Sequence, residues 1–383
     1  MGTTVDKLNR LINTKEGIRQ ELNRAYKTEE ISTSDTFNSY IQKLEEHPYY
    51  IMRYIERSIE SIKLSNVTSI GDYAFKGCSS LTEVSFPVAT SIGGSAFQDC
   101  SGLTSVSFPL ATSISGYAFK GCSSLTSVSF PLATSIGGYE FNGCTGLTSV
   151  SFPVATSISG SAFRDCSGLT EVFIPNATSI SSYAFYGCSS LTEVSFPEVK
   201  SISSYAFRDC SSLTSISFPV ATSIGNYAFS SCSNLTSISF PLATSIGQYA
   251  FSSCSSLPSV SFPLATSIGD YAFHSCRGLT SVSISEATSI GQYAFYNCSS
   301  LTEVSFPNVT SIGQVAFSGC SSLTTIYVGT NTSTVCTLSN TSAFNNCTNL
   351  ANIYVPASLV DSYKSATNWL NYADKIKATP ESS

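Results

Sequence analysis

The sequence repeats, with substitutions at some positions, the unit Thr68-Ser69-Ile70-Gly71-Asp72-Tyr73-Ala74-Phe75-Lys76-Gly77-Cys78-Ser79-Ser80-Leu81-Thr82-Glu83-Val84-Ser85-Phe86-Pro87-Val88-Ala89. Cysteines recur at one constant interval, from Cys78 and Cys100 to Cys320, and a phenylalanine stands three positions before each of them. A further pair, Phe344 and Cys347, follows after a short insertion. A unit of this size cannot bury its own apolar face, so it must stack on its neighbours. The repeat therefore predicts a solenoid in which each unit makes one coil.

The second half of each unit has the alternation of a β-strand. In the first complete unit, Val84 and Phe86 are expected to point inward, while Glu83 and Ser85 point outward. Pro87 ends the strand because it has no N–H to donate to a ladder. Counting such segments from residues 59–64 to residues 350–355 predicts 14 parallel strands.

The remaining apolar positions of the unit are expected to fill the interior of each coil. In the first unit these positions are Ile70, Phe75, Cys78 and Leu81. A column of tyrosines that includes Tyr73 is expected to be a packing ladder on the opposite side from the strands, rather than a binding stripe.

The pattern Leu-x-x-Val-x-Phe-Pro, followed by Ile-Gly-x-Tyr-Ala-Phe-x-Gly-Cys-x-x-Leu, resembles the BspA-like leucine-rich repeat family over about residues 59–355. The resemblance implies a right-handed leucine-rich repeat solenoid of the α/β type. Its parallel strands would lie on the concave face and short helical turns on the convex face. Members of this family are mostly surface proteins that bind host or matrix molecules, so the resemblance also implies a binding function.

Charge divides the chain of 383 residues into three parts. Residues 1–64 hold 10 basic and 10 acidic residues, whereas the net charge of −6 is carried by residues 65–328. We predict a helical head over residues 1–57 for attachment or oligomerisation, a solenoid over 58–355, and a helical cap over 356–383. A nucleic-acid partner is not expected of a chain with this charge.

The two ends carry resemblances of their own. The segment Leu8-x-x-Leu11-x-x-Thr14-Lys15-x-x-Ile18, followed by Thr36-Phe37-x-x-Tyr40-Ile41, resembles short helical modules in tail proteins of phages from gut Firmicutes. This resemblance implies a virion partner for the head. The tail, from Tyr354 to Ile376, resembles the C-terminal end of many gut-bacterial and phage proteins of this repeat class.

The cysteine column is expected to be a buried ladder of reduced thiols. A straight file gives each thiol at most two thiol neighbours, whereas zinc needs four converging ligands. Disulfides between neighbouring coils stay an alternative, because a coil spacing of roughly 4.8 Å lies within the Cα range of a bridge. Cys336 is out of register, in the insertion 330–341, and is predicted to be the most exposed thiol.

The sequence shows no set of residues typical of an enzyme. The two histidines, His47 and His274, are expected to be solvated surface residues. No phosphate-binding loop is visible, and the many serines are repeat positions rather than a singular nucleophile. We therefore predict no catalytic residues, no metal and no cofactor.

The outward columns of the strands offer the candidate binding site. The first column, which contains Glu83, holds four glutamates and no basic residue among its mainly serine side chains. The second column, from Ser85 to Tyr327, is serine except at Phe173 and Tyr327. Glu171, Phe173 and Glu193 form the predicted ligand patch, because an exposed aromatic ring between two acids can anchor a ligand. The alternative is that small polar side chains only keep the sheet soluble.

Two functions follow from these features. The first is a non-enzymatic binding or structural protein of a phage virion, which presents the solenoid to a host protein or a glycan. The second is a bacterial cell-surface adhesin of the BspA type. No apolar run is long enough to span a membrane, and no apolar stretch follows the N-terminal residues as in a secretory signal. The protein is therefore expected to be made in the cytoplasm without a signal peptide.

Overall fold

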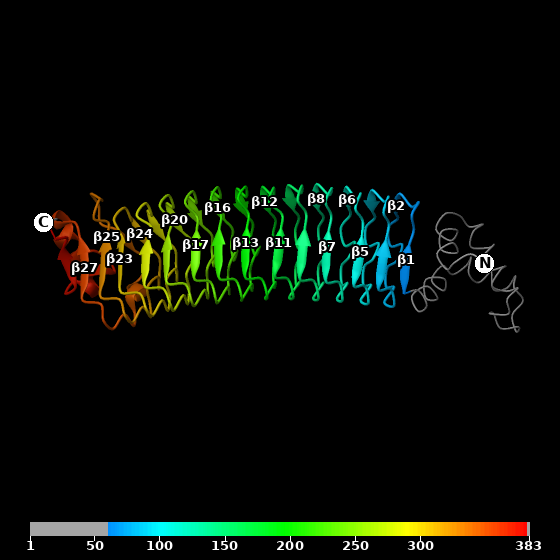
Figure 1. The fold of residues 1–383 in the computed structure, drawn as a ribbon. Coiled ribbons are helices and arrows are strands. Elements are labelled where there is room, and N and C mark those ends of the chain that lie inside the picture. The colour runs from blue at the N-terminus through cyan, green and yellow to red at the C-terminus, as the bar shows by residue number, and fades with distance from the viewer. Residues whose placement is uncertain (1–59, 381–383) are drawn as a thin grey trace, which may run out of the picture.

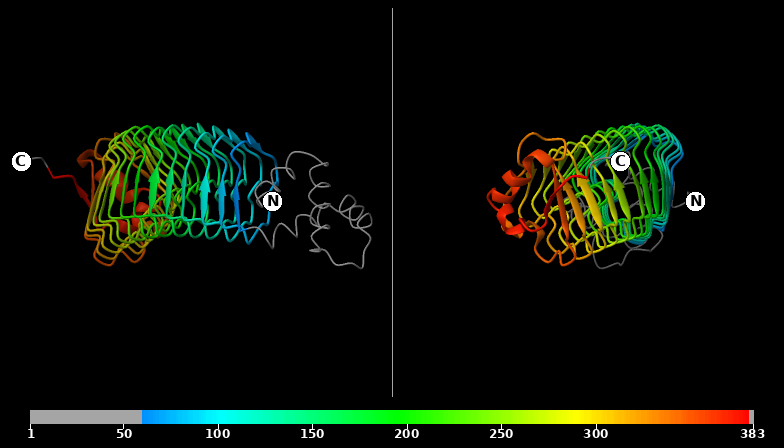
Figure 2. Two further views of the ribbon diagram at one scale, coloured as in Figure 1. Left: turned by 45° about the vertical axis from the view of Figure 1, so that its right-hand side comes forward. Right: turned by 90° about the vertical axis from the view of Figure 1, so that its left-hand side faces the viewer.

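The computed structural model describes residues 60–380, which form a rod of stacked coils (Figure 1). Two further views show each coil stacked on the one before it, with the C-terminal segment closing one end of the rod (Figure 2). The predicted helical head, residues 1–57, lies outside the described residues.

Each coil contributes a longer strand, and together these strands confirm the predicted count of 14. They are β1 (Ser61–Lys63), β3 (Glu83–Ser85), β5 (Ser105–Ser107), β7 (Ser127–Ser129), β9 (Ser149–Ser151), β11 (Glu171–Phe173), β13 (Glu193–Ser195), β15 (Ser215–Ser217), β17 (Ser237–Ser239), β19 (Ser259–Ser261), β21 (Ser281–Ser283), β23 (Glu303–Phe306), β25 (Thr325–Val328) and β27 (Asn352–Val355).

A second ladder consists of two-residue strands, each of which follows the turn after one of the longer strands β1 to β25, and the sequence did not predict it. Its members are β2 (Ser69–Ile70), β4 (Ser91–Ile92), β6 (Ser113–Ile114), β8 (Ser135–Ile136), β10 (Ser157–Ile158), β12 (Ser179–Ile180), β14 (Ser201–Ile202), β16 (Ser223–Ile224), β18 (Ser245–Ile246), β20 (Ser267–Ile268), β22 (Ser289–Ile290), β24 (Ser311–Ile312) and β26 (Thr337–Leu338). Strands this short cannot show an alternation in the sequence.

Both ladders are parallel and in register, because identical units stack directly on one another. Ser61 pairs with Glu83 and Ser69 with Ser91, each partner standing one repeat further along the chain. Within the described residues the ladder of longer strands is interrupted between β5 and β7, β11 and β13, and β17 and β19. The ladder of short strands is interrupted once, between β6 and β8.

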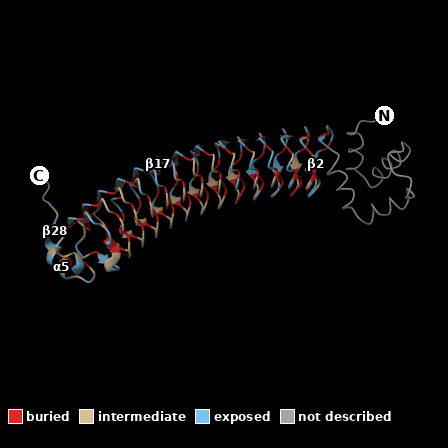
Figure 3. Cartoon of the chain, turned by 90° about the horizontal axis from the view of Figure 1, so that it is seen from below, coloured by how far each residue is buried: buried red, intermediate tan, exposed pale blue. Residues whose placement is uncertain are grey.

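The interior of the rod is filled as predicted. Val84, Phe86, Phe75 and Leu81 are buried, and buried side chains follow each coil along the rod (Figure 3). The rings of the column that begins at Phe75 stack on one another at 5.1 to 5.6 Å between centroids. Each such aromatic pair contributes about 0.5–1.5 kcal/mol beyond the area it buries, so the column binds each coil to the next.

The cysteine column is also buried, as predicted. From Cys100 to Cys320 each thiol donates to the carbonyl oxygen of a phenylalanine in the preceding coil, at 2.9 to 3.2 Å. Burial raises the pKa of these thiols, for example that of Cys144 to about 12, although the backbone N–H of Cys122 opposes the shift. Neutral thiols of this kind react slowly.

The expected short helical turns take the form of single hydrogen-bonded turns. The N–H groups of Lys76 and Cys78 donate three positions back, to Tyr73 and Phe75, whereas the N–H of Gly77 between them donates to the next coil. This alternation prevents a continuous helix. Tyr73 has a left-handed backbone, with φ of 59°, a conformation that non-glycine side chains rarely adopt.

The C-terminal cap consists of the 3₁₀ helices η2 (Ala357–Leu359) and η3 (Trp369–Tyr372), the helix α5 (Val360–Ser365) and the strand β28 (Ile376–Ala378). A further 3₁₀ helix, η1 (Thr341–Phe344), lies in the last coil before β27. The strand β28 pairs with β27 and so extends the ladder, which the prediction of a purely helical cap missed.

The prediction that Cys336 is the most exposed thiol was wrong. Cys336 is 1% exposed, because the cap packs on the insertion that carries it. Its N–H donates to the hydroxyl of Tyr363 at 2.9 Å, and its carbonyl accepts from Nε1 of Trp369 at 2.7 Å. Cys347, in the last unit, is the partly exposed thiol instead.

Candidate ligand-binding face

The outward side chains of the longer strands form a surface that we call the strand face. Its two columns are mainly serines, which present hydroxyl groups that can both donate and accept hydrogen bonds. Most of these side chains are exposed or half-buried, while the middle residue of each strand points into the core. The face is therefore polar, shallow and repetitive.

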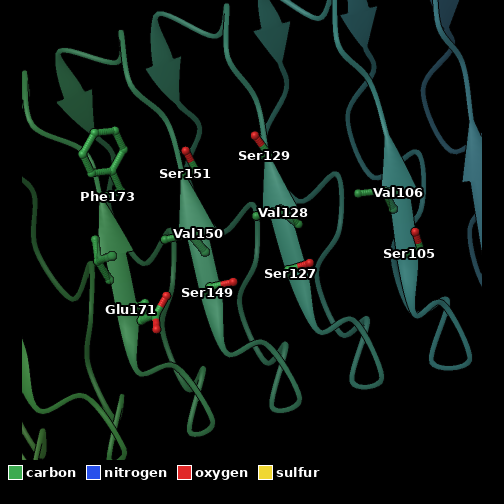
Figure 4. Close-up of a pocket in the computed structure, with 11 residues that line it drawn as sticks. Ser105, Val106, Ser127, Val128, Ser129, Ser149, Val150, Ser151, Glu171 and Phe173 are labelled. Carbon is green, nitrogen blue, oxygen red and sulfur yellow. The ribbon is translucent and has the colours of Figure 1, made fainter.

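A groove of about 400 Å³ lies on this face across β5, β7, β9 and β11 (Figure 4). It is lined by Ser105, Val106, Ser127, Val128, Ser129, Ser149, Val150, Ser151, Glu171, Val172 and Phe173. The interruption of the ladder between β5 and β7 falls inside this groove.

The side chains of the groove lie in three rows. Ser127, Ser149 and Glu171 form one row, and Ser129, Ser151 and Phe173 form another, with valines between them (Figure 4). Val128 and Val150 are almost fully buried, whereas Val106 and Val172 at the two ends are half-buried. The groove thus has an apolar floor between two polar rows, and the aromatic ring and the carboxylate both stand at its β11 end.

The structure brings together two of the three residues of the predicted patch. Glu171 and Phe173 lie on β11 and both line the groove, whereas Glu193 lies on β13 and does not. The ladder between β11 and β13 is interrupted, so Glu193 stands across that break. The ring of Phe173 is 56% exposed.

Phe173 points outward because its neighbour takes the inward position. In most coils a phenylalanine fills that position, as Phe152 does one coil earlier, but here the buried residue is Ile174. The backbone keeps its register, because the N–H of Phe152 donates to the carbonyl of Phe173 at 2.9 Å. The outward ring is therefore a substitution on a normal coil rather than a distortion of it.

Charge on the strand face is unevenly distributed. Lys63, on the first described strand, pairs with Glu83 at 2.9 Å. Among the ion pairs within residues 60–380, neither Glu171 nor Glu193 takes part in one. The carboxylates near the groove are thus available to accept hydrogen bonds from a ligand.

An aromatic pair, which the predicted patch did not include, lies near the C-terminal end of the face. The rings of Tyr327 and Tyr354 stack at 5.0 Å between centroids. Burial raises the pKa of Tyr327, and the negative charge of Glu303 raises it further. The sequence signal for this pair was the replacement of serine by Tyr327 in the second outward column.

The tyrosine column on the other side of the rod is a packing ladder, as predicted. The rings from Tyr183 to Tyr293 stack at 4.3 to 4.7 Å between centroids. Arg164 and Arg208 lie over rings of this column, at 5.6 Å from Tyr183 and 5.8 Å from Tyr205. The tyrosines chiefly stack on one another, which leaves the strand face as the better candidate for a ligand.

No group of three or more histidine, cysteine, aspartate or glutamate side chains within residues 60–380 is placed to hold a metal ion. Over the same residues, none of the helices combines the length and the apolar character needed to cross a bilayer. The strand face offers hydroxyls, carboxylates and aromatic rings, which can bind a ligand by hydrogen bonding and stacking.

Comparison with known proteins gives a family match and several structural neighbours. The family model described as "BspA type Leucine rich repeat region (6 copies)" matches residues 49–170, 156–266 and 266–371. No curated protein matches the chain. A leucine-rich repeat protein from Bacteroides ovatus has a similar structure, with 26% identity and a TM-score of 0.66 over 84% of this chain and 92% of that chain.

Two further solved structures are more distant. A leucine rich cell surface protein from Faecalibacterium prausnitzii is 23% identical, with a TM-score of 0.42 over 84% of each chain. A leucine-rich repeat protein from Eubacterium ventriosum is 24% identical, with a TM-score of 0.47 over 72% of this chain and 86% of that chain.

Proposed function

Because the chain belongs to the BspA-type leucine-rich repeat family, we propose that it is a non-enzymatic binding protein whose strand face receives an extended ligand. The observation that carries this proposal is the groove, where the exposed ring of Phe173 and the carboxylate of Glu171 meet at one end of two serine rows. The ligand is a protein segment or a glycan on a biological surface.

The shape of the face favours such a ligand over a small metabolite. Sites for metabolites are usually concave and bury most of the ligand. Here the serines recur at each coil, so a ligand with a repeating backbone can form similar hydrogen bonds on successive strands. The half-exposed Phe173 provides the apolar anchor that binding faces commonly use. Glu193 lies on the next strand, outside the groove, and would contact the same ligand only where the ligand extends beyond β11.

The biological setting is proposed from the family and from the head. The resemblance of the first residues to phage tail modules supports a virion protein whose head contacts a virion partner. Family membership supports the alternative, a bacterial cell-surface adhesin. The neighbouring genes distinguish the two, because tail and capsid genes would surround the first and cell-envelope genes the second.

A binding screen tests the proposed function. The full chain is screened against a glycan array and immobilised host-surface proteins, and every hit is measured again with Phe173→Ser. This change restores the serine of the repeat at an exposed position, so it should leave stability unchanged within about 0.5 kcal/mol. Leu264→Ser is the matched control, because Leu264 is also exposed, at 46%, but lies outside the strand face.

We expect Phe173→Ser to weaken binding at least tenfold and Leu264→Ser to leave it unchanged. If Phe173→Ser and Leu264→Ser both bind as tightly as the wild type, the groove is not the binding site.

A further inference from the structure

Glu140 departs from the repeat at a fully buried position. The equivalent residues in the flanking coils are Ala118 and Ala162, whose methyl groups fill the interior. Glu140 is 0% exposed, although a carboxyl group is much larger and can ionise. Burying a charge without partners is costly, so this substitution requires a structural explanation.

The carboxyl group of Glu140 replaces one backbone hydrogen bond of the ladder of short strands. At the other coils from Gly93 to Ser339, the N–H that follows the short strand donates to the carbonyl one coil earlier. The N–H of Gly137 donates instead to Oε2 of Glu140, at 3.0 Å. Among the described residues, no backbone N–H of the next coil donates to the carbonyl of Ile114.

The ladder of short strands lacks its direct backbone hydrogen bonds at this junction. Thr112 donates to Thr90 at 2.9 Å and Thr156 donates to Thr134 at 3.0 Å, but the equivalent bond from Thr134 to Thr112 is absent. The longer strands β5 and β7 are also unpaired at the same junction. At the other two breaks in the longer ladder, the short strands stay paired, β12 with β14 and β18 with β20.

The turns that follow β6 and β8 remain hydrogen-bonded to each other across this junction. Tyr117 donates to Gly138 at 3.1 Å, and Phe119 donates to the carbonyl of Glu140 at 2.9 Å. Within residues 60–380, the junction between β6 and β8 is therefore the place where both ladders are interrupted while the turns still hold the coils together.

The second carboxyl oxygen of Glu140 suggests how the unpaired acceptors at this junction can form a hydrogen bond. Oε1 of Glu140 is buried and has no hydrogen-bond partner. A Cβ added to Gly137 would lie 3.3 Å from Oε1 and 3.2 Å from the carbonyl oxygen of Ile114, so both acceptors border the same space beside Gly137. Two acceptors cannot bond to each other, but a protonated carboxyl group supplies the missing O–H donor.

We propose that a protonated Glu140 bridges the two coils, accepting from the N–H of Gly137 and donating to the carbonyl of Ile114, and that loss of this proton opens the junction between β6 and β8. The carboxylic acid thus stands in for a direct backbone hydrogen bond. The junction between β6 and β8, which we call the joint, is then a contact between two coils whose strength depends on pH.

Burial supports this assignment because it raises the pKa of Glu140, while the hydrogen bond from Gly137 opposes the shift. The other titratable groups of its own turn and the two flanking turns are Tyr117, Lys120, Cys122, Tyr139, Cys144, Arg164, Asp165 and Cys166. None of them is among the causes of the shift. A carboxyl whose pKa is raised on folding stabilises the fold fully below its unfolded pKa, roughly 4.3, and this stability is lost as the pH rises through the folded pKa.

The variant Glu140→Gln tests the proposal, because an amide keeps the acceptor for Gly137 and offers an N–H donor to Ile114 at every pH. Amide hydrogen exchange is measured on the full chain from pH 4.5 to 8, after correction for the intrinsic pH dependence of exchange. The peptide covering residues 112–137 reports the joint, and residues 222–247 report an intact junction. Glu198→Gln, an exposed acid, is the charge-matched control.

In the wild type, we expect the equilibrium constant for opening of the joint to increase by up to tenfold for each pH unit. In Glu140→Gln, we expect this constant to be independent of pH. The same pH dependence in both proteins would overturn the proposal.

Glu140→Ala provides a second test, because it restores the residue of the flanking coils. We expect Gly137 to donate to Ile114 in this variant, so that the joint is protected at every pH. Exchange as fast as in the wild type at pH 8 would show that the coils, and not Glu140, keep the ladder open.

Discussion

The thiol of Cys210 donates a hydrogen bond to the carbonyl oxygen of Phe185, one coil earlier, at 3.1 Å. The same bond recurs along the rod and explains why this column is cysteine. Alanine offers no donor at this position. The thiol therefore links the interior side chains of one coil to the backbone of the coil before it.

This relationship predicts the effect of Cys210→Ala. The variant loses a weak hydrogen bond and leaves a small cavity, so we expect a loss of about 1 kcal/mol in the free energy of unfolding. Urea denaturation measures the change. Stability equal to that of the wild type would mean that the thiol only fills space.

Truncation of the neighbouring aromatic column should have a larger effect. Phe207 is fully buried and stacks on Phe185 and Phe229 at 5.1 and 5.3 Å. We expect Phe207→Ala to lower the free energy of unfolding by about 3–5 kcal/mol. Because each coil contacts only its neighbours, hydrogen exchange should increase locally. A uniform increase along the rod would contradict this.

The buried ladder also predicts the redox state of the protein. The chain has 14 cysteines, and we expect thiol titration in denaturant without reductant to find nearly all of them. In the native state, Cys347 should react before the fully buried thiols of the column. A count of half or fewer would indicate disulfides between coils and hence an oxidised protein.

The cap depends on the hydroxyl group of Tyr363, which accepts the N–H of Cys336 at 2.9 Å. Tyr363→Phe keeps the ring but leaves this buried donor unpaired, which costs about 1–3 kcal/mol. We expect exchange at Cys336 to increase while the central coils stay unchanged. Trp369→Phe is a parallel test on the carbonyl of the same residue. An unchanged Cys336 amide would show that the hydroxyl does not hold the insertion.

Much of the fold could be predicted because the repeat is strict. The spacing from Phe75 to Cys78 to Leu81 recurs in each unit, so their burial in one coil implies their burial in the next. The candidate site was predictable for the same reason. Phe173 is noticeable because it interrupts a column of serines, and the structure then places it with Glu171 at one groove.

The features that escaped prediction depend on contacts between segments far apart in the sequence. The exposure of Cys336 could not be judged, because its burial depends on Tyr363 and Trp369, which stand much further along the chain. The sequence likewise could not show that the ladder breaks between β11 and β13, which carry Phe173 and Glu193, because these strands have nearly the same sequence.

The coil, the number of longer strands and the composition of the interior follow from the repeat, because its constant period sets which side chains meet in neighbouring coils. The positions at which the ladders are interrupted, and the way in which Glu140 is accommodated, depend instead on how the coils stack. The sequence shows Glu140 only as a glutamate in a column of alanines such as Ala118 and Ala162. Its consequence arises because the stacked coils bury it beside Gly137, where its carboxyl group competes with the backbone for a hydrogen bond.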